Sequence, residues 1–240
     1  MNKRLATLAL ATGVLFAATA SARDVGVEIT NLTNGTYFTP LLVAAHNRNT
    51  HLFELGAPAS AHLQAMAEGG DISGLMTDVE AAGGVVGSNG GLLAPGDSAS
   101  VVLAVRGRST ARLSVVAMLL PTNDGFVGLD ALRIPKRRGR YTYYLNAYDA
   151  GTEANDEIIN GGGAPGVPGI PADPGANGGT NGSGVAGPDQ NPNVHIHRGV
   201  LGDTDPVGGA SDLDSRVHRW LNPVARVVVT VRGSGHNDDD

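Results

Sequence analysis

Two apolar runs separated by a short turn limit the fold of this chain more than any other feature. The runs cover residues 113–120 and 126–134, and residues 121–125 (PTNDG) between them either fix φ or tolerate turn conformations. A third run, 141–148, is rich in aromatic residues that suit a pleated sheet and leads into Asp149. We therefore expect three strands, with carboxylates in the loops at the strand ends.

Further strands are expected along the rest of the chain, at short intervals and with Gly-rich turns. This spacing predicts a mainly β protein, an antiparallel β-sandwich, and not a βαβ fold. Two short helices are expected at 58–68 and 74–82, where good helix formers end at Gly pairs. The further strands are expected at residues 25–33, 38–46, 98–106 and 224–231. Residues 106–110 are short enough to join 98–106 to 113–120 as an antiparallel pair.

A Gly/Pro-rich segment interrupts this pattern. Residues 161–188 are mostly Gly, Pro, Ala and Asn, with almost no large apolar side chains. Such a segment does not offset the entropy of ordering by burial, so we expect a long mobile insertion at about 160–192.

The two ends of the chain are expected to lie outside this domain. Lys3 and Arg4, an apolar stretch and a small-residue site at 20–22 predict a cleaved signal peptide over 1–22, and hence a secreted or periplasmic protein. Residues 233–240 form an acidic tail that we expect to be disordered. One domain over 23–232 remains, with no transmembrane segment predicted in it.

The net charge restricts the possible partners of the protein. The chain has no cysteine and a net charge of -6, which becomes -8 without Lys3 and Arg4. This charge opposes general binding to nucleic acid or anionic lipid. The exception is the basic run at 136–140, which we interpret as a solvated hairpin loop, with a polyanion-binding patch as the alternative.

Asp124, Asp149 and Glu153 are the candidate metal ligands. They come from loops that gather at one edge if the strands are neighbours in one sheet, and clustered carboxylates repel one another unless a cation lies among them. Ca²⁺ is the expected cation, because it binds six to eight oxygens from carboxylates, carbonyls and amides. The alternative is that each acid caps its own turn.

Several stretches of the chain resemble the spondin domain, the module of F-spondin and mindin that also occurs alone in bacterial secreted proteins. The two signature stretches are 121–129 (PTNDGFVGL) and 148–153 (YDAGTE). Segments similar to the family occur in the same order elsewhere, at 38–46, 65–70, 78–83 and 223–227. The resemblance implies a C2-like β-sandwich that holds calcium at one end.

The resemblance also implies which residues hold the calcium. Asp124 matches the aspartate of the first signature loop, and Asp149 that of the second. Mindin has a further acidic ligand on a preceding strand, whereas the corresponding residues 98–105 contain no carboxylate. Either another group replaces this ligand, with Glu153 and Asp97 the nearest acids in sequence, or the site is weaker.

Histidines offer a second possible metal site. His195 and His197 point to one face if extended, which suits a transition metal, although no third ligand is evident and a surface pair is the alternative. His46, His51 and His62 lack the spacing of zinc motifs. We expect His46 to be hydrogen-bonded at a strand end, and the other two to be exposed.

No recognised catalytic motif occurs in the sequence. We therefore expect a secreted, calcium-binding, non-enzymatic adhesion or recognition module. The resemblance implies an extracellular protein, a glycan or lipopolysaccharide as its ligand. The alternatives are a metal-assisted hydrolase that uses the same acids or the His195/His197 pair, and a structural component of an extracellular matrix or surface layer.

Overall fold

The structure, a computed structural model, describes residues 23–107, 109–176, 178–185 and 191–232. Its strands and helices follow the chain in the order β1 Arg23–Asn31, β2 Tyr37–Phe38, β3 Leu42–His46, α1 Ala61–Gly69, α2 Ser73–Ala81, β4 Val85–Gly87, β5 Ser98–Val105, β6 Arg112–Leu120, β7 Gly125–Arg133, β8 Gly139–Asp149, β9 His195–Ile196 and β10 Ala225–Val231. The predicted signal peptide (1–22) and acidic tail (233–240) lie outside the described residues.

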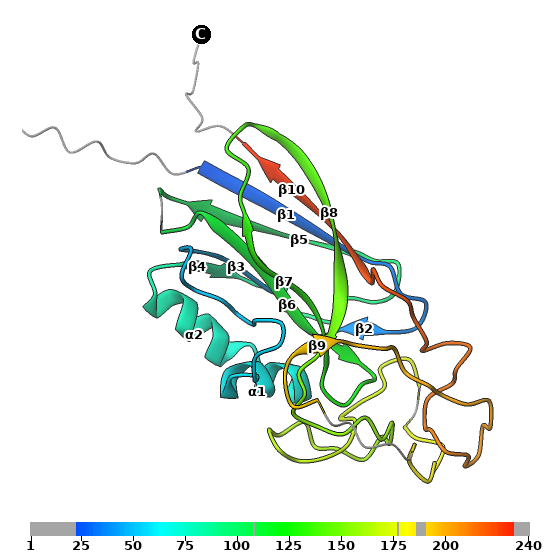
Figure 1. Cartoon of the computed structure of the whole chain (residues 1–240). Coiled ribbons are helices and arrows are strands. Elements are labelled where there is room, and N and C mark those ends of the chain that lie inside the picture. Colours follow the sequence, from blue (N-terminus) through cyan, green and yellow to red (C-terminus); the bar gives the residue numbers. More distant parts are fainter. Residues whose placement is uncertain (1–22, 108, 177, 186–190, 233–240) are drawn as a thin grey trace, which may run out of the picture.

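The sheet is antiparallel and strongly curved. Its strand order is β4-β3-β6-β7-β8-β10-β1-β5, with β2 on β6 and β9 on β8. β4 also contacts β5, so the two ends of this path approach each other (Figure 1). The prediction of a mainly β, antiparallel, sandwich-like fold with two short helices is confirmed.

Alternation along the central strand divides the interior into two apolar clusters. Leu113, Val115 and Ala117 of β6 face the cluster enclosed by the curved sheet. Val116 and Met118 face the second cluster, which lies between the sheet and the helices (Figure 1). Because both faces of β6 are buried, β6 is an interior strand.

The two helices form much as the sequence predicts. The Ser60 side chain caps α1 by accepting a hydrogen bond from Leu63 N (3.1 Å), and Gly70 ends the helix in the left-handed region with φ of 72°. α2 begins one residue earlier than expected, at Ser73, whose backbone N–H donates to the Asp71 carboxylate (2.9 Å). Leu63, Met66 and Val79 of these helices are buried against the sheet.

The expected hairpin between residues 98–106 and 113–120 is wrong. β5 pairs with β1, whereas β6 lies between β3 and β7. The difference follows from burial: the residues of β5 alternate between exposed and buried, as in an edge strand, while β6 needs cover on both faces. The short segment between them therefore crosses from one half of the sheet to the other.

The Gly/Pro-rich insertion buries more than its composition indicates. Ile170 is fully buried in a small cluster with Val200 and Leu213, against which Ile159 and Trp220 pack. Acidic side chains accept hydrogen bonds from backbone N–H groups of the insertion, such as Gly182 N to Asp212 Oδ1 (2.8 Å). The expectation that this segment has nothing to bury is therefore wrong, because one isoleucine anchors it. Its mobility stays a prediction.

Replacing this anchor tests how firmly the insertion is attached. Ile170→Ala should lower the free energy of unfolding by about 2–4 kcal/mol, the usual cost of a fully buried Ile truncated to Ala. Val167→Ala, in the same segment at a side chain that is 46% exposed, is the matched control and should change it by less than about 0.5 kcal/mol. Urea unfolding measures both. Equal effects of the two substitutions would contradict a docked Ile170.

Candidate functional site

The signature loops meet at one end of the sheet. Asp124 ends the turn between β6 and β7, and Asp149 is the last residue of β8. Antiparallel pairing places Gly125 opposite Asp149, and Ala150 N donates to the carbonyl oxygen of Asp124 (3.2 Å). The two aspartates, 25 positions apart in the sequence, are therefore neighbours in the structure, as the sequence predicts.

The Asp124 carboxylate is fully buried and only half satisfied. Its Oδ2 atom accepts hydrogen bonds from Thr152 N (2.8 Å), Thr152 Oγ1 (3.2 Å) and Glu153 N (3.1 Å). Its Oδ1 atom is buried and has no hydrogen-bond partner among the described residues. A buried acceptor without a donor is costly, and it marks a position for a proton or a cation.

Asp149 is buried beside Asp124 and is held by its own loop. Asp149 Oδ1 accepts from Gly151 N (2.8 Å), and Oδ2 accepts from the Asn155 side chain (2.8 Å). The Gly151 bond is the turn capping expected of an acid that serves only its own loop. These two bonds occupy lone pairs on both oxygens of Asp149, but the donors are neutral and supply no positive charge.

Glu153 borders the same loops from a half-buried position. Its Oε1 atom accepts from Asn123 Nδ2 (3.0 Å) and Gly169 N, and its Oε2 atom is buried without a partner among the described residues. Burial raises the pKa of this carboxyl above its usual range, with Glu68 and Asp156 adding repulsion. Glu153 also lines a pocket of about 200 Å³ that contains Glu68 and Asp156.

The electrostatics of Asp124 follow from this crowding. Burial, and after it repulsion from Asp149, raise the pKa of Asp124 from 3.8 to about 8, against the opposing backbone hydrogen bonds. At neutral pH and without a cation, the site therefore retains a proton. A divalent cation between Asp124 and Asp149 would take the place of that proton.

The donors fit a hard cation such as Ca²⁺ in chemistry, but not as a complete set of side-chain ligands. Asp124 and Asp149 supply carboxylate oxygens, the type Ca²⁺ prefers. No group of three or more His, Cys, Asp or Glu side chains within the described ranges is arranged to hold a metal ion. Asp97, one possible replacement for the missing strand acid, is exposed just before β5. The remaining ligands of a bound ion would have to be backbone carbonyls and water.

Asn123 and Thr152 are site residues that the sequence analysis missed. Asn123 donates to Glu153 and to Asp156 Oδ1 (2.9 Å) and accepts from Glu157 N (3.2 Å), so it connects the first signature loop to the second. Thr152 donates twice to Asp124. Both residues directly precede a candidate acid in the sequence, which is the one signal that could have identified them.

His195 begins β9 beside the site and His197 directly follows that strand; the two are half-buried and buried, whereas Ile196 between them is exposed. His195 Nδ1 is 2.9 Å from the Asn193 carbonyl oxygen and 3.7 Å from Asp149 Oδ1. His197 is buried, accepts from Gly199 N (3.0 Å) and packs against Trp220, with ring centroids 5.1 Å apart. They are therefore not an exposed surface pair, and metal binding by them stays a prediction.

The histidines at positions 46, 51 and 62 lie as expected. His46 is buried at the end of β3 and contacts Ser114 Oγ (2.7 Å) and the Asn47 carbonyl oxygen (2.8 Å). His51 and His62 have side chains that are 37% and 48% exposed, and they pair with Asp130 and Asp78.

A curved antiparallel sheet with two short helices and paired acidic loops at one end is a β-sandwich-like fold, the class that the sequence predicts. The Spondin_N family model matches residues 30–157, more than half of the chain and a range that includes both signature loops. The protein belongs to the spondin N-terminal domain family. A search of curated proteins finds no match to the chain.

The raised pKa of Asp124 predicts how stability varies with pH in calcium-free buffer. A carboxyl with a pKa of about 8 in the folded state and about 3.8 in the unfolded state binds its proton more tightly when folded. The stability it contributes is therefore present below pH 4 and decreases as pH rises to 8. The total is on the order of 5 kcal/mol. Asp124→Asn should remove most of this slope of the free energy of unfolding against pH, and the variant should be more stable than the wild type at pH 8.

Urea unfolding between pH 5 and 8.5 in the presence of EDTA measures this effect. Asp205→Asn, at an exposed acid in a distant loop, is the control and should keep the wild-type slope. An unchanged slope in Asp124→Asn would show that Asp124 is ionised in the folded protein without metal.

Proposed function

We propose that this protein is a calcium-stabilised, extracellular recognition module, with Ca²⁺ held at the edge of the sheet by Asp124 and Asp149. The observation that supports this proposal is the buried Asp124 Oδ1 atom, which has no donor among the described residues and lies beside a second buried carboxylate. A protein that needed only turn capping here would gain nothing from burying two carboxyl groups side by side.

A bound ion would supply positive charge and act as a cross-link. It would offset the Asp124–Asp149 repulsion and tie the turn before β7 to the loop after β8. Glu153 is the third candidate ligand, since its N–H already donates to Asp124 and its Oε2 atom is buried without a partner among the described residues.

The family supports the coarser part of this function. Membership in the spondin N-terminal domain family indicates an extracellular domain of the recognition or adhesion type, and such domains are generally non-enzymatic. No helix in the described ranges is long and apolar enough to cross a membrane. We propose an extracellular protein, a glycan or lipopolysaccharide as the class of ligand.

Calcium should raise the melting temperature of the protein, and Asp149→Ala should abolish the increase. At a Ca²⁺ concentration 100 times the dissociation constant, binding to the folded state adds about 2.7 kcal/mol of stability. For a domain of this size that corresponds to an increase of about 5–10 °C. Differential scanning calorimetry in Ca²⁺ and in EDTA measures the shift.

Asp97→Asn provides the matched control, because Asp97 was the other candidate for the missing ligand and is exposed. Its calcium-dependent shift should equal that of the wild type. Superimposable wild-type melting curves in Ca²⁺ and in EDTA would refute the calcium proposal.

A further inference from the structure

A basic pocket lies at the end of the sheet opposite the acidic loops. It has a volume of about 660 Å³ and is lined by Arg48, Arg112 and Arg133 together with Asn47, Asn49 and Ala111. Arg112 begins β6, whereas Asp124 follows its other end. Nine residues of extended chain separate the two regions by roughly 27 Å.

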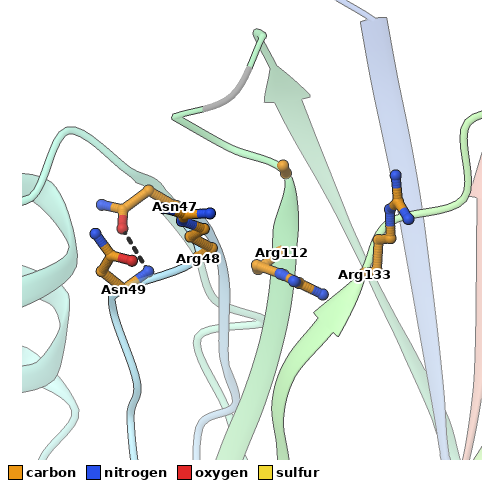
Figure 2. Close-up of a pocket in the computed structure, with 6 residues that line it drawn as sticks. Asn47, Arg48, Asn49, Arg112 and Arg133 are labelled. Atoms are coloured by element: carbon orange, nitrogen blue, oxygen red, sulfur yellow. Dashed lines mark hydrogen bonds between the residues drawn. The ribbon is translucent and has the colours of Figure 1, made fainter.

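The three arginines come from segments far apart in the sequence. Arg112 and Arg133 are direct cross-strand partners at the ends of β6 and β7, and Arg48 follows His46, which is itself paired with Arg112. Figure 2 shows the three side chains in a row across the ends of these strands, with Arg112 in the middle. This placement results from strand register and leaves no contiguous signal in the sequence.

None of these guanidinium groups has an anionic partner within the part of the chain that the structure describes. The ion pairs found there involve other residues, and no hydrogen bond from Arg48, Arg112 or Arg133 side chains occurs there. The nearby Asp130 carboxylate is already occupied by His51, Leu52 N and Ser114. Like charges directly opposite each other in a sheet are unfavourable. The Arg112–Arg133 pair therefore weakens the fold unless an anion binds between the two side chains.

The asparagines give the pocket neutral hydrogen-bonding groups in addition to charge. Asn49 N donates to Asn47 Oδ1 (2.8 Å), which forms a side-chain turn around Arg48 (Figure 2). Asn47 Nδ2 also donates to the carbonyl oxygen of Ala82 after α2 (3.3 Å), so the turn is tied to the helix. The exposed Asn49 side chain is then available to hydroxyl groups of a ligand.

More positive charge lies at the same end of the sheet as the pocket. The β7–β8 loop carries Lys136, Arg137 and Arg138, all exposed, and Arg23 Nη1 donates to the Lys136 carbonyl oxygen (3.3 Å) at the start of β1. This field would concentrate anions near the pocket. The basic run at 136–140 is exposed as predicted: residues 136–138 form the hairpin loop, and Gly139 and Arg140 begin β8.

We propose that this pocket binds an anionic carbohydrate, through carboxylate or sulfate groups on the arginines and hydroxyl groups on the asparagines. Guanidinium groups bind planar and tetrahedral oxyanions with paired hydrogen bonds, and amides suit sugar hydroxyls. None of the described residues that line the pocket is an aromatic on which a base could stack, which favours a glycan over a single-stranded nucleic acid. This inference gives the recognition function a ligand class, but it does not rest on the calcium site.

Isothermal titration calorimetry of the full chain with a heparin hexasaccharide tests the proposal, with oligogalacturonate and neutral dextran of equal length as comparisons. We expect binding of one or both acidic oligosaccharides, which identifies sulfate or carboxylate as the preferred group, and no binding of dextran. Lack of binding to both acidic sugars, or equally tight binding of a single-stranded DNA of the same charge, would overturn it.

Two double variants distinguish specific binding in the pocket from general electrostatic attraction to the basic end of the sheet. Arg112→Gln with Arg133→Gln should weaken binding of the acidic sugar at least tenfold without lowering the melting temperature, because it removes an unfavourable pair. Arg137→Gln with Arg138→Gln changes the net charge equally outside the pocket and should weaken binding less than threefold at 150 mM salt. Equal losses in both variants would show that no specific pocket exists.

Calcium dependence distinguishes this proposal from the function proposed above. Binding of the acidic sugar should be the same in Ca²⁺ and in EDTA, and the same in Asp149→Ala, because the pocket lies at the other end of β6. Loss of sugar binding in EDTA would place the ligand at the acidic loops and refute the pocket. A failed calcium shift in the melting temperature would leave the sugar result unaffected.

Discussion

Antiparallel pairing of β6, β7 and β8 is the constraint on which both ends of the molecule depend. It places Gly125 opposite Asp149, and so two buried carboxylates side by side. The same ladder places Arg112 opposite Arg133 at the other end. β6 cannot slip by one residue, because both its faces are buried and a slip would exchange the two apolar clusters it separates. Hydrophobic alternation therefore fixes the position of the charged groups.

Both ends hold like charges together, but they differ in burial. Asp124 is fully buried and retains a proton up to a pKa of about 8, so the protein itself has a means of reducing the repulsion. Arginine has no such means, because it does not lose its proton in proteins. Arg112 and Arg133 therefore remain charged, and their repulsion is reduced only by partial exposure to water or by an anion.

The sequence predicted the parts of the molecule that depend on local pattern. The 113–120 and 126–134 strands, both helices and the meeting of Asp124 with Asp149 follow from apolar runs, caps and turn residues close together in the chain. The pairing of β5 with β1 was missed, since it depends on which strand needs cover on both faces. Ile170 was missed because a single buried side chain leaves no periodic signal. The basic pocket was missed for a related reason, as three separate strand ends form it.

The net charge of -6 conceals the separation of the arginine pocket at one end of β6 from the acidic loops at the other. Net charge governs long-range attraction averaged over orientations, and by that measure the protein should avoid polyanions. At separations comparable with the Debye length of about 8 Å, however, a ligand at the basic end is screened from the acidic loops roughly 27 Å away. An anionic carbohydrate would therefore contact the arginine end and leave the acidic loops free. A calcium ion at those loops would order them, and it would not link the carbohydrate to the protein.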